Sequence, residues 1–202
     1  MIRQIVQAYS RSRVIERKWH GRGAKQTYRY IVNPLTENIP LPDPLWSEWI
    51  ADTIHMQTPD QIDKVLTAES LGLPIAQLVA SRKSKPLAVV RKRNFHDASN
   101  LFAKVRYASG FEHGTYWIYG ISEGDKVLII DDAISTGGTL APLLSVLQGK
   151  GVTVTDAFCV LEKPEYQGVR NVRKATGFNV KTLFRVDTRS RECVPTRYTH
   201  LA

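Results

Sequence analysis

The sequence has few cysteines and lacks a long hydrophobic run, and each absence narrows the class of protein. Two cysteines occur among 202 residues. Cys159 lies in an apolar run and Cys193 in a basic segment, and their spacing suggests neither a metal site nor a disulfide framework. No apolar stretch reaches the length of a membrane span, and the first residues lack the hydrophobic core of a signal peptide. A cytoplasmic protein that does not span a membrane is expected.

A nucleoside-triphosphate loop is absent as well. Such a loop reads Gly-x-x-x-x-Gly-Lys-Ser/Thr, and no run of that kind occurs in the chain. Kinase and ATPase functions are therefore excluded. There is no internal repeat, and 43% of the residues are hydrophobic. Because strand patterns alternate with helical patterns, one α/β domain spanning residues 1–202 is predicted.

Acidic residues are scarce at the start of the chain. The formal net charge is +9, and residues 1–30 hold eight basic residues against the single acid Glu16, which gives this part a charge of +7. A basic arm over residues 1–27 can bind the phosphates of nucleic acid. It can equally be a solvated face or part of a site for a polyanionic substrate, so nucleic acid is a possible partner but not the favoured one.

The stretch from Val127 to Thr139 carries the most informative pattern, and it reads Val-Leu-Ile-Ile-Asp-Asp-Ala-Ile-Ser-Thr-Gly-Gly-Thr. Four apolar residues without alternation predict a strand that is buried on both faces of a parallel sheet. Asp131 and Asp132 follow where that strand ends, at the edge where open α/β sheets bind ligands. The small, hydroxyl-rich loop after them leads into a helical run at 140–147 and can wrap a phosphate with its amides and hydroxyls.

These residues resemble the phosphoribosyl-pyrophosphate signature of the type I phosphoribosyltransferases, in which hydrophobic residues precede two acids, three variable residues and Thr-Gly-Gly-Thr. In that family the acids hold the ribose hydroxyls, and the loop holds the 5-phosphate. The resemblance implies that Asp131 and Asp132 bind and orient the ribose. It implies that the phosphate side of the substrate is bound by Ala133, Ser135, Thr136, Gly137, Gly138 and Thr139.

A second glycine turn follows the strand expected at 62–67. Its residues Glu69, Ser70 and Gly72 resemble the family's first phosphate loop, which cradles pyrophosphate and often contains a strained peptide. Adenine-specific members usually carry arginine where Leu71 stands. This departure weakens an adenine assignment and fits the archaeal hypoxanthine type better.

A basic strand end follows at Arg91 and Lys92, after the apolar strand expected at 86–90. Guanidinium and ammonium groups suit the oxygens of pyrophosphate, and the family has a matching basic strand end. A solvated basic turn is the other interpretation. In some relatives such residues reach the neighbouring subunit's site, so the resemblance implies a homodimer.

Residues 94–114 are polar and show no convincing core stripe. Loops of that length are usually disordered or functional. The family places here a mobile flap that closes over the reacting ribose and excludes water. Glu112 lies roughly where adenine enzymes have a glutamate proposed to handle the base proton. His96 and His113 have pKa values suited to proton transfer, although exposed loop histidines are the favoured interpretation.

The ends of the chain are less informative. The segment from Tyr30 to Thr36 is similar to one near the start of archaeal-type hypoxanthine phosphoribosyltransferases, and it is the candidate for part of the hood that covers the base. Tyr28, Tyr30 and Trp46 can stack on a base, but core positions are favoured. The other expected elements are helices at 2–9, 45–54 and 75–79 and strands at 27–32, 117–121 and 177–183. Residues 152–154 and 157–161 are expected to form either a strand pair or one bent strand. The basic tail, 186–202, matches no assignable pattern, and disorder is one interpretation of it.

The resemblance covers residues 28–185 and implies a type I phosphoribosyltransferase fold, a mostly parallel sheet flanked by helices with a small hood and a mobile flap. The expected activity is magnesium-dependent transfer of a 5-phosphoribosyl group from phosphoribosyl pyrophosphate to a purine. Hypoxanthine or guanine is preferred over adenine, and orotate or a modified purine stays open. Mg²⁺ is expected to bind through the substrate, near the two aspartates. The alternative is a regulator of the same fold that senses nucleotides without turnover, with the basic arm as its effector end.

Overall fold

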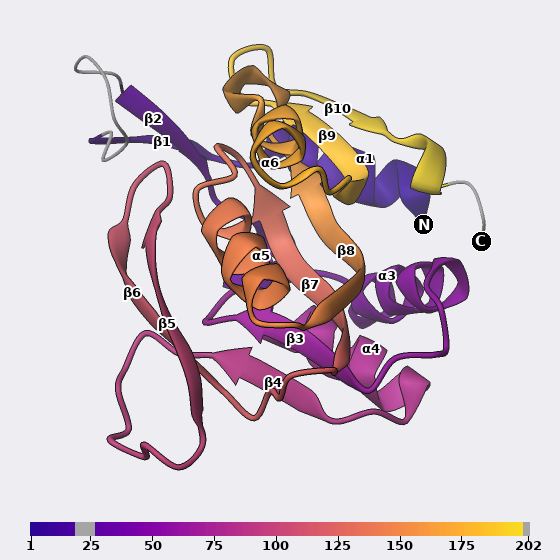
Figure 1. Cartoon of the computed structure of the whole chain (residues 1–202). Coiled ribbons are helices and arrows are strands. Elements are labelled where there is room, and N and C mark those ends of the chain that lie inside the picture. Colours follow the sequence, from indigo (N-terminus) through magenta and orange to yellow (C-terminus); the bar gives the residue numbers. More distant parts are fainter. Residues whose placement is uncertain (19–26, 200–202) are drawn as a thin grey trace.

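The computed structural model describes residues 1–18 and 27–199, and a six-stranded sheet forms its centre (Figure 1). The strand order is β10-β9-β8-β7-β3-β4, and every neighbouring pair is parallel except β10 with β9. The strands are β3 (Lys64–Ala68), β4 (Leu87–Val90), β7 (Lys126–Ile134), β8 (Thr153–Glu162), β9 (Lys181–Asp187) and β10 (Glu192–Pro195). The predicted mostly parallel α/β sheet is confirmed.

The order of the five parallel strands places a ligand site between β3 and β7. Numbered by their order in the chain, these strands read 2-1-3-4-5 across the sheet. The chain winds in opposite directions from β3 and from β7, so the loops that follow these two neighbours lead to opposite faces of the sheet. A crevice therefore opens at their carboxyl ends, as it does at the switch point of other open α/β sheets.

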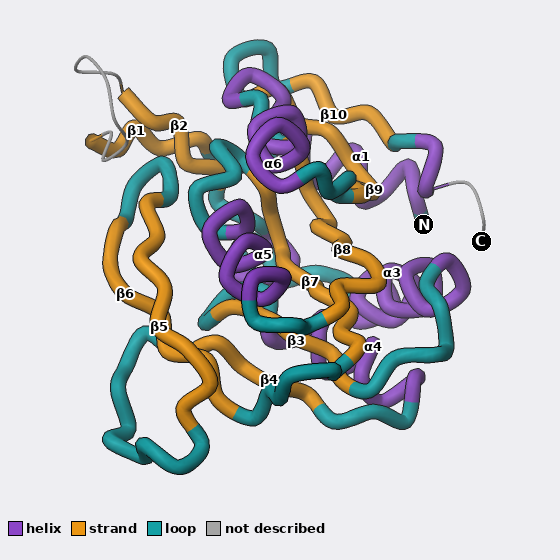
Figure 2. The backbone as a smooth tube through the Cα atoms, in the orientation of Figure 1, coloured by secondary structure: helices purple, strands orange, loops and turns teal. Residues whose placement is uncertain are grey.

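Helices cover both faces of the sheet (Figure 2). One hydrophobic core lies between the sheet and the helices α1 (Ile2–Arg11), α3 (Pro44–Gln57) and α4 (Leu73–Lys83). A second hydrophobic core lies between the sheet and the helices α5 (Leu140–Gly149) and α6 (Gly168–Thr176). Strand β7 contributes to both: Leu128 and Ile130 belong to the first core, and Val127 and Ile129 to the second. The predicted burial of this strand on both faces is confirmed.

The helix starts follow from local chemistry. The side chain of Asp43 accepts a hydrogen bond of 2.9 Å from the amide of Leu45, and Pro44 occupies the first turn of α3, where it needs no amide donor. Helix α5 begins at Leu140, directly after Thr139. Pro142 therefore lies in the first turn and removes no hydrogen bond from the helix interior, which confirms a start near Thr139.

The expectation of a long polar loop at 94–114 holds for residues 94–100 but is wrong from residue 101 on, because the structure has a β-hairpin there. Strands β5 (Leu101–Ala108) and β6 (His113–Tyr119) pair in an antiparallel register. Ala103, Val105 and Tyr107 are buried and alternate with exposed Lys104 and Arg106. The period of two was present, but a small alanine on the inner face and long cations on the outer face concealed it. Mobility of this segment stays a prediction.

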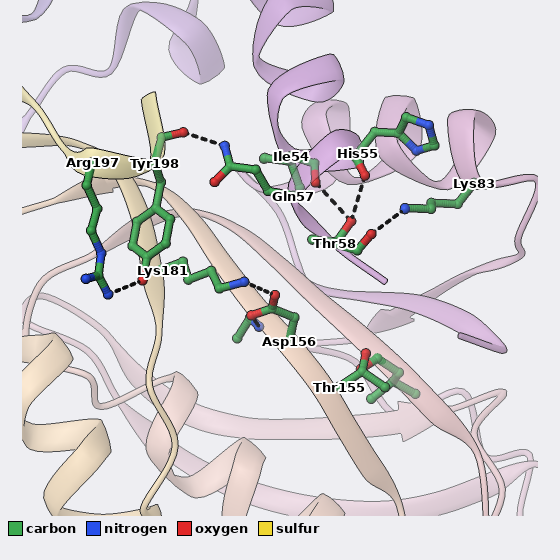
Figure 3. Close-up of polar contacts among 12 residues, drawn as sticks. Ile54, His55, Gln57, Thr58, Lys83, Thr155, Asp156, Lys181, Arg197 and Tyr198 are labelled. Carbon is green, nitrogen blue, oxygen red and sulfur yellow. Dashed lines mark hydrogen bonds and ion pairs between the residues drawn. The ribbon is translucent and has the colours of Figure 1, made fainter. Parts of the chain in front are cut away.

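The interpretation of the basic tail as disordered is also wrong for the described residues. Strand β10 pairs with β9, and the 3-10 turn η2 (Arg197–Thr199) returns to the sheet. In Figure 3 the side chain of Gln57, at the end of α3, donates a hydrogen bond to the carbonyl of Tyr198. The ammonium of Lys181 pairs with Asp156 and lies 5.8 Å from the ring centre of Tyr198. The tail is thus fastened to both a helix and the sheet.

Several short elements were not anticipated. Strand β1 (Val14–Lys18) is one of them, and it pairs with β2 (Thr27–Ile31), the strand expected at 27–32, as a two-stranded arm. The others are α2 (Pro34–Glu37) and the 3-10 turn η1 (Pro164–Tyr166), each less than two turns long. The turn expected at 19–25 lies outside the described residues. Among the described helices, none combines the length and the apolar character that a membrane crossing needs.

Candidate active site

A cavity of about 340 Å³ lies at the carboxyl ends of β3 and β7. Nine predicted site residues line it, namely Glu69, Ser70, Lys92, Glu112, Asp131, Asp132, Ala133, Ser135 and Thr139. Gly72, Thr136, Gly137 and Gly138 do not line it but shape the loops that do. Arg91 lies outside the cavity, because it pairs with Trp117 of the hairpin. The segments predicted to bind the ribose, the 5-phosphate and the pyrophosphate thus meet in one cavity.

Of the two adjacent aspartates, Asp131 is buried and Asp132 half-buried, and neither forms an ion pair with a described residue. The Oδ1 atom of Asp131 accepts a 2.9 Å hydrogen bond from the amide of Asp132, and Oδ2 of Asp132 accepts a 3.3 Å bond from Asn33. Burial raises the pKa of both carboxyls, and the charge of Asp132 raises the pKa of Asp131 further. Such a pair is stabilised when hydroxyl donors or a cation enter the cavity.

The loop after β7 is packed between two elements. On one side, Gly168 at the start of α6 approaches so closely that a Cβ atom there would lie 2.2 Å from the carbonyl oxygen of Ser135. The side chain of Asn171 donates a 3.0 Å hydrogen bond to the carbonyl of Thr136. Gly137 has φ +79°, a backbone conformation that favours glycine. Helix α6 therefore holds one side of this loop in place.

The β5–β6 hairpin packs against the other side of the loop after β7. The amide of Ala108 donates a 3.2 Å hydrogen bond to the carbonyl of Gly138. A Cβ atom on Gly138 would lie 1.8 Å from the carbonyl oxygen of Ala108, so only glycine allows this approach. The loop's amides and hydroxyls precede α5, where the helix dipole adds a positive potential. This geometry suits a phosphate group.

The turn after β3 reaches the same aspartates. Its Glu69–Ser70 peptide bond is cis. A Cβ atom on Gly72 would lie 2.9 Å from Oδ1 of Asp131, so glycine lets the two loops touch. The carboxylate of Glu69 accepts a 2.9 Å hydrogen bond from the amide of Lys92, which ties the ends of β3 and β4 together.

The hairpin tip roofs the cavity. The ammonium of Lys92 contacts both carboxylate oxygens of Glu112, at 2.9 and 2.7 Å. The ring of Phe111 lies 5.6 Å from that of Tyr28 and 5.0 Å from that of Tyr30, centre to centre. Figure 1 shows the tip of the hairpin directed toward the β1–β2 arm. The roof thus rests on aromatic contacts with β2.

The aromatic residues divide between core and site. Tyr28 is buried, as favoured from the sequence, but it also lines the cavity, and half-buried Tyr30 lines it too. Trp46 packs against the core beneath α1, α3 and α4. The segment proposed as hood therefore contributes Tyr30, and also Asn33, to the cavity wall.

Sequence reasoning missed Lys163, the buried cation of the cavity. Its side chain is 2% exposed, its Nζ lies 3.7 Å from the ring centre of Tyr28 and 4.8 Å from that of Tyr166, and it donates to the carbonyl of Arg29. Burial lowers the pKa of Lys163 to about 7. In the sequence, the feature that could have indicated Lys163 is its position directly after the strand β8. Since β8 lies beside β7, a side chain at that position reaches the same edge of the sheet.

Comparison with known proteins agrees with this geometry. A family model described as the phosphoribosyl transferase domain matches residues 47–190. The chain belongs to the phosphoribosyltransferase family. A hypoxanthine/guanine phosphoribosyltransferase of Methanothermobacter thermautotrophicus is 38% identical over 163 residues, 81% of this chain and 82% of that protein. One of the same name from Methanosalsum zhilinae is 36% identical over 160 residues, 79% of this chain and 82% of the relative.

Solved structures support the fold of this phosphoribosyltransferase. The adenine phosphoribosyltransferase of Thermoanaerobacter pseudethanolicus superposes with a TM-score of 0.67 at 16% identity, over 92% of this chain and 99% of the other. The adenine enzyme of Trypanosoma brucei, in complex with AMP, pyrophosphate and ribose-5-phosphate, gives 0.66 at 18% identity, over 90% of this chain and 79% of the other. The predicted type I fold and the family resemblance are both confirmed.

Proposed function

We propose that the protein transfers a 5-phosphoribosyl group from phosphoribosyl pyrophosphate to a purine base, giving a nucleoside monophosphate and pyrophosphate. The observation that carries the proposal is a single cavity that joins an acid pair without an ion-pair partner among the described residues to a phosphate-type loop. The similarity to relatives named hypoxanthine/guanine phosphoribosyltransferases supports the same activity.

In this proposal each wall of the cavity binds one part of the substrate. Ser135, Thr136 and Thr139 with the intervening amides hold the 5-phosphate and fix the ribose for attack. Asp131 and Asp132 accept hydrogen bonds from the ribose hydroxyls, and their negative charge stabilises the positive charge that grows on the sugar as pyrophosphate leaves. The turn after β3 and the ammonium of Lys92 face the departing oxygens.

The cavity also fits Mg²⁺. Carboxylate and hydroxyl oxygens are the ligands this ion prefers, and the hydroxyl of Thr67, close beneath Gly72 and Asp131, has no hydrogen-bond partner among the described residues. No described group of three or more His, Cys, Asp or Glu side chains could hold a metal alone. We therefore propose that Asp131 or Asp132 holds the ion together with substrate oxygens. When bound, it neutralises charge on the pyrophosphate.

Lys163 favours an oxopurine over adenine. A lysine ammonium only donates hydrogen bonds, and it would donate to the C6 oxygen of hypoxanthine or guanine, whereas adenine presents an amino group there. The base would lie against the apolar surfaces of Tyr28 and Phe111. Since burial lowers the pKa of Lys163 to about 7, affinity for an oxopurine should fall as the pH rises above 7 and the amine loses its proton.

Replacement of Lys163 by methionine tests this base preference. We expect kcat/KM for hypoxanthine to fall about 10- to 100-fold relative to kcat/KM for adenine, the effect of one charge-assisted hydrogen bond of about 1.5–3 kcal/mol. Exposed Lys174→Met is the matched control and should change neither value. An equal loss with both bases would show that Lys163 only supports the fold of the cavity.

The activity itself is tested by incubating the purified protein with phosphoribosyl pyrophosphate, Mg²⁺ and, separately, hypoxanthine, guanine, adenine and orotate. Pyrophosphate release that depends on an oxopurine is expected. Tight nucleotide binding without turnover for any base would support a sensing regulator instead. The homodimer and the cytoplasmic location stay predictions, and sedimentation of the purified protein would test the first.

A further inference from the structure

Two segments near the cavity leave neighbouring strands and then separate. The phosphate loop, residues 135–139, follows β7, and the base-side turn, residues 163–167, follows β8. Where both strands end, the amide of Lys163 donates a 2.9 Å hydrogen bond to the carbonyl of Ile134. Beyond this point the first segment leads into α5 and the second into α6, so the sheet no longer fixes the distance between them.

The side chain of Asn171, in the first turn of α6, bridges the two segments. Its Nδ2 atom donates a 3.0 Å hydrogen bond to the carbonyl of Thr136 in the phosphate loop and a 3.3 Å bond to the carbonyl of Tyr166 in the base-side turn. An amide nitrogen carries two hydrogens, so both bonds form at once. Since both partners are carbonyls, the nitrogen rather than the oxygen of the side chain must face them.

The base-side turn is connected to the groups proposed to bind the purine. The hydroxyl of Tyr166 accepts a 2.8 Å hydrogen bond from the amide of Arg29. The ring of Tyr166 lies 5.0 Å from the ring centre of Tyr28 and 4.8 Å from Nζ of Lys163. Tyr28 and Lys163 line the cavity, so a shift of the Tyr166 backbone would be passed on to both.

We infer, on the basis of the proposed function, that Asn171 is a positioning residue that sets the distance between the base subsite and the 5-phosphate subsite. Asn171 does not line the cavity and acts through the two carbonyls that it holds. A nucleoside monophosphate carries base and phosphate on one ribose, so both ends bind together only when the two subsites are correctly spaced. Ribose 5-phosphate lacks the base, and its affinity is independent of that spacing.

The packing of α6 does not depend on Asn171. The side chain of Asn171 is exposed, whereas Val172 is fully buried and Gly168 packs against Ser135 and Ile134. The helix therefore stays attached to the core when Asn171 is replaced. Loss of its two hydrogen bonds should change the geometry of the cavity rather than the folding of the chain.

Calorimetric titration of the full chain with inosine monophosphate (IMP) and, separately, with ribose 5-phosphate tests the inference. In Asn171→Ala and in Asn171→Leu, which is similar in size to asparagine, we expect affinity for IMP to fall about 10-fold, the effect of two neutral hydrogen bonds. Affinity for ribose 5-phosphate should change less than threefold, which also shows that the variants fold. The kcat for IMP formation should fall about 10- to 100-fold with little change in KM for phosphoribosyl pyrophosphate.

Gln148→Ala is the matched control, because it removes an exposed amide side chain from the neighbouring helix α5 and should change neither affinity nor kcat. Equal losses for IMP and ribose 5-phosphate would overturn the inference and show that Asn171 only shapes the phosphate loop. Unchanged affinity for IMP in both variants would overturn it too, as would wild type that binds IMP no more tightly than ribose 5-phosphate. Because these titrations need no turnover, they decide the inference even if wild type forms no IMP, the result that would contradict the proposed transfer.

Discussion

The double variant Asp131→Asn/Asp132→Asn should lose at least 1,000-fold in kcat while its melting temperature rises by about 2–4 °C. The loss follows because the carboxylates supply the negative charge that faces the sugar in the transition state, and removal of one preorganised electrostatic group typically costs 100- to 1,000-fold. The amide side chains keep the oxygens that accept from the amide of Asp132 and from Asn33. The variant should therefore fold normally.

The gain in stability has an electrostatic cause. Burial raises the pKa of both carboxyls above their unfolded values, so ionisation of the pair costs more free energy in the folded chain than in the unfolded chain. Neutral side chains remove that penalty, and about 1 kcal/mol corresponds to 2–4 °C in a chain of this size. The gain should be largest near neutral pH and shrink as the pH falls through the carboxylate range, where the wild-type pair is protonated as well.

Calorimetry and initial rates measure the two effects on the same preparation. Glu123→Gln/Glu192→Gln is the matched control, because it removes two acidic charges from exposed positions and should change neither rate nor melting temperature. Product formation that survives in the aspartate variant would contradict the assigned role of the pair. A lower melting temperature would show instead that the pair is stabilised in the folded chain by contacts other than those described.

Gly138→Ala should lower kcat/KM for phosphoribosyl pyrophosphate about 100-fold or more. The added methyl group would lie 1.8 Å from the carbonyl oxygen of Ala108, so either the loop or the hairpin must move. A displacement of about 1 Å at a positioning element can reduce a rate 100-fold. Overpacking of this kind also costs about 1–3 kcal/mol of stability.

The matched control for this steric effect is Gly149→Ala in α5, where a methyl group meets nothing within 4 Å. That variant should keep full activity and gain up to about 1 kcal/mol, because alanine favours the helix. Steady-state kinetics and thermal unfolding of both variants provide the measurement. Unchanged kcat/KM in Gly138→Ala would show that the contact between loop and hairpin is not needed for substrate binding.

The parts predicted well from the sequence are those whose pattern is local. The four apolar residues before Asp131 are typical of a strand buried on both faces, and the glycines and hydroxyls after it predict a turn into a helix. Strand and loop are contiguous in the chain, so no distant contact was needed to place them. The turn at Glu69–Gly72 was predicted for the same reason.

The parts that were missed depend on which elements become neighbours. Arg91 and Lys92 look equivalent in the sequence, but pairing with Trp117 turns Arg91 to the outer face of the hairpin, while Lys92 lines the cavity. Successive residues of an extended chain point to opposite sides, so the choice depends on a partner strand that the sequence did not reveal. Lys163 was missed likewise, because its place in the cavity follows from β8 lying beside β7.

The hydrogen bond between Ala108 and Gly138 joins the roof of the cavity to the loop proposed to hold the 5-phosphate. A roof fastened in this way cannot lift without pulling on that loop. Opening of the cavity and release of the 5-phosphate of the product nucleotide would then be coupled. The loop would lose its contacts with the phosphate when the hairpin moves away.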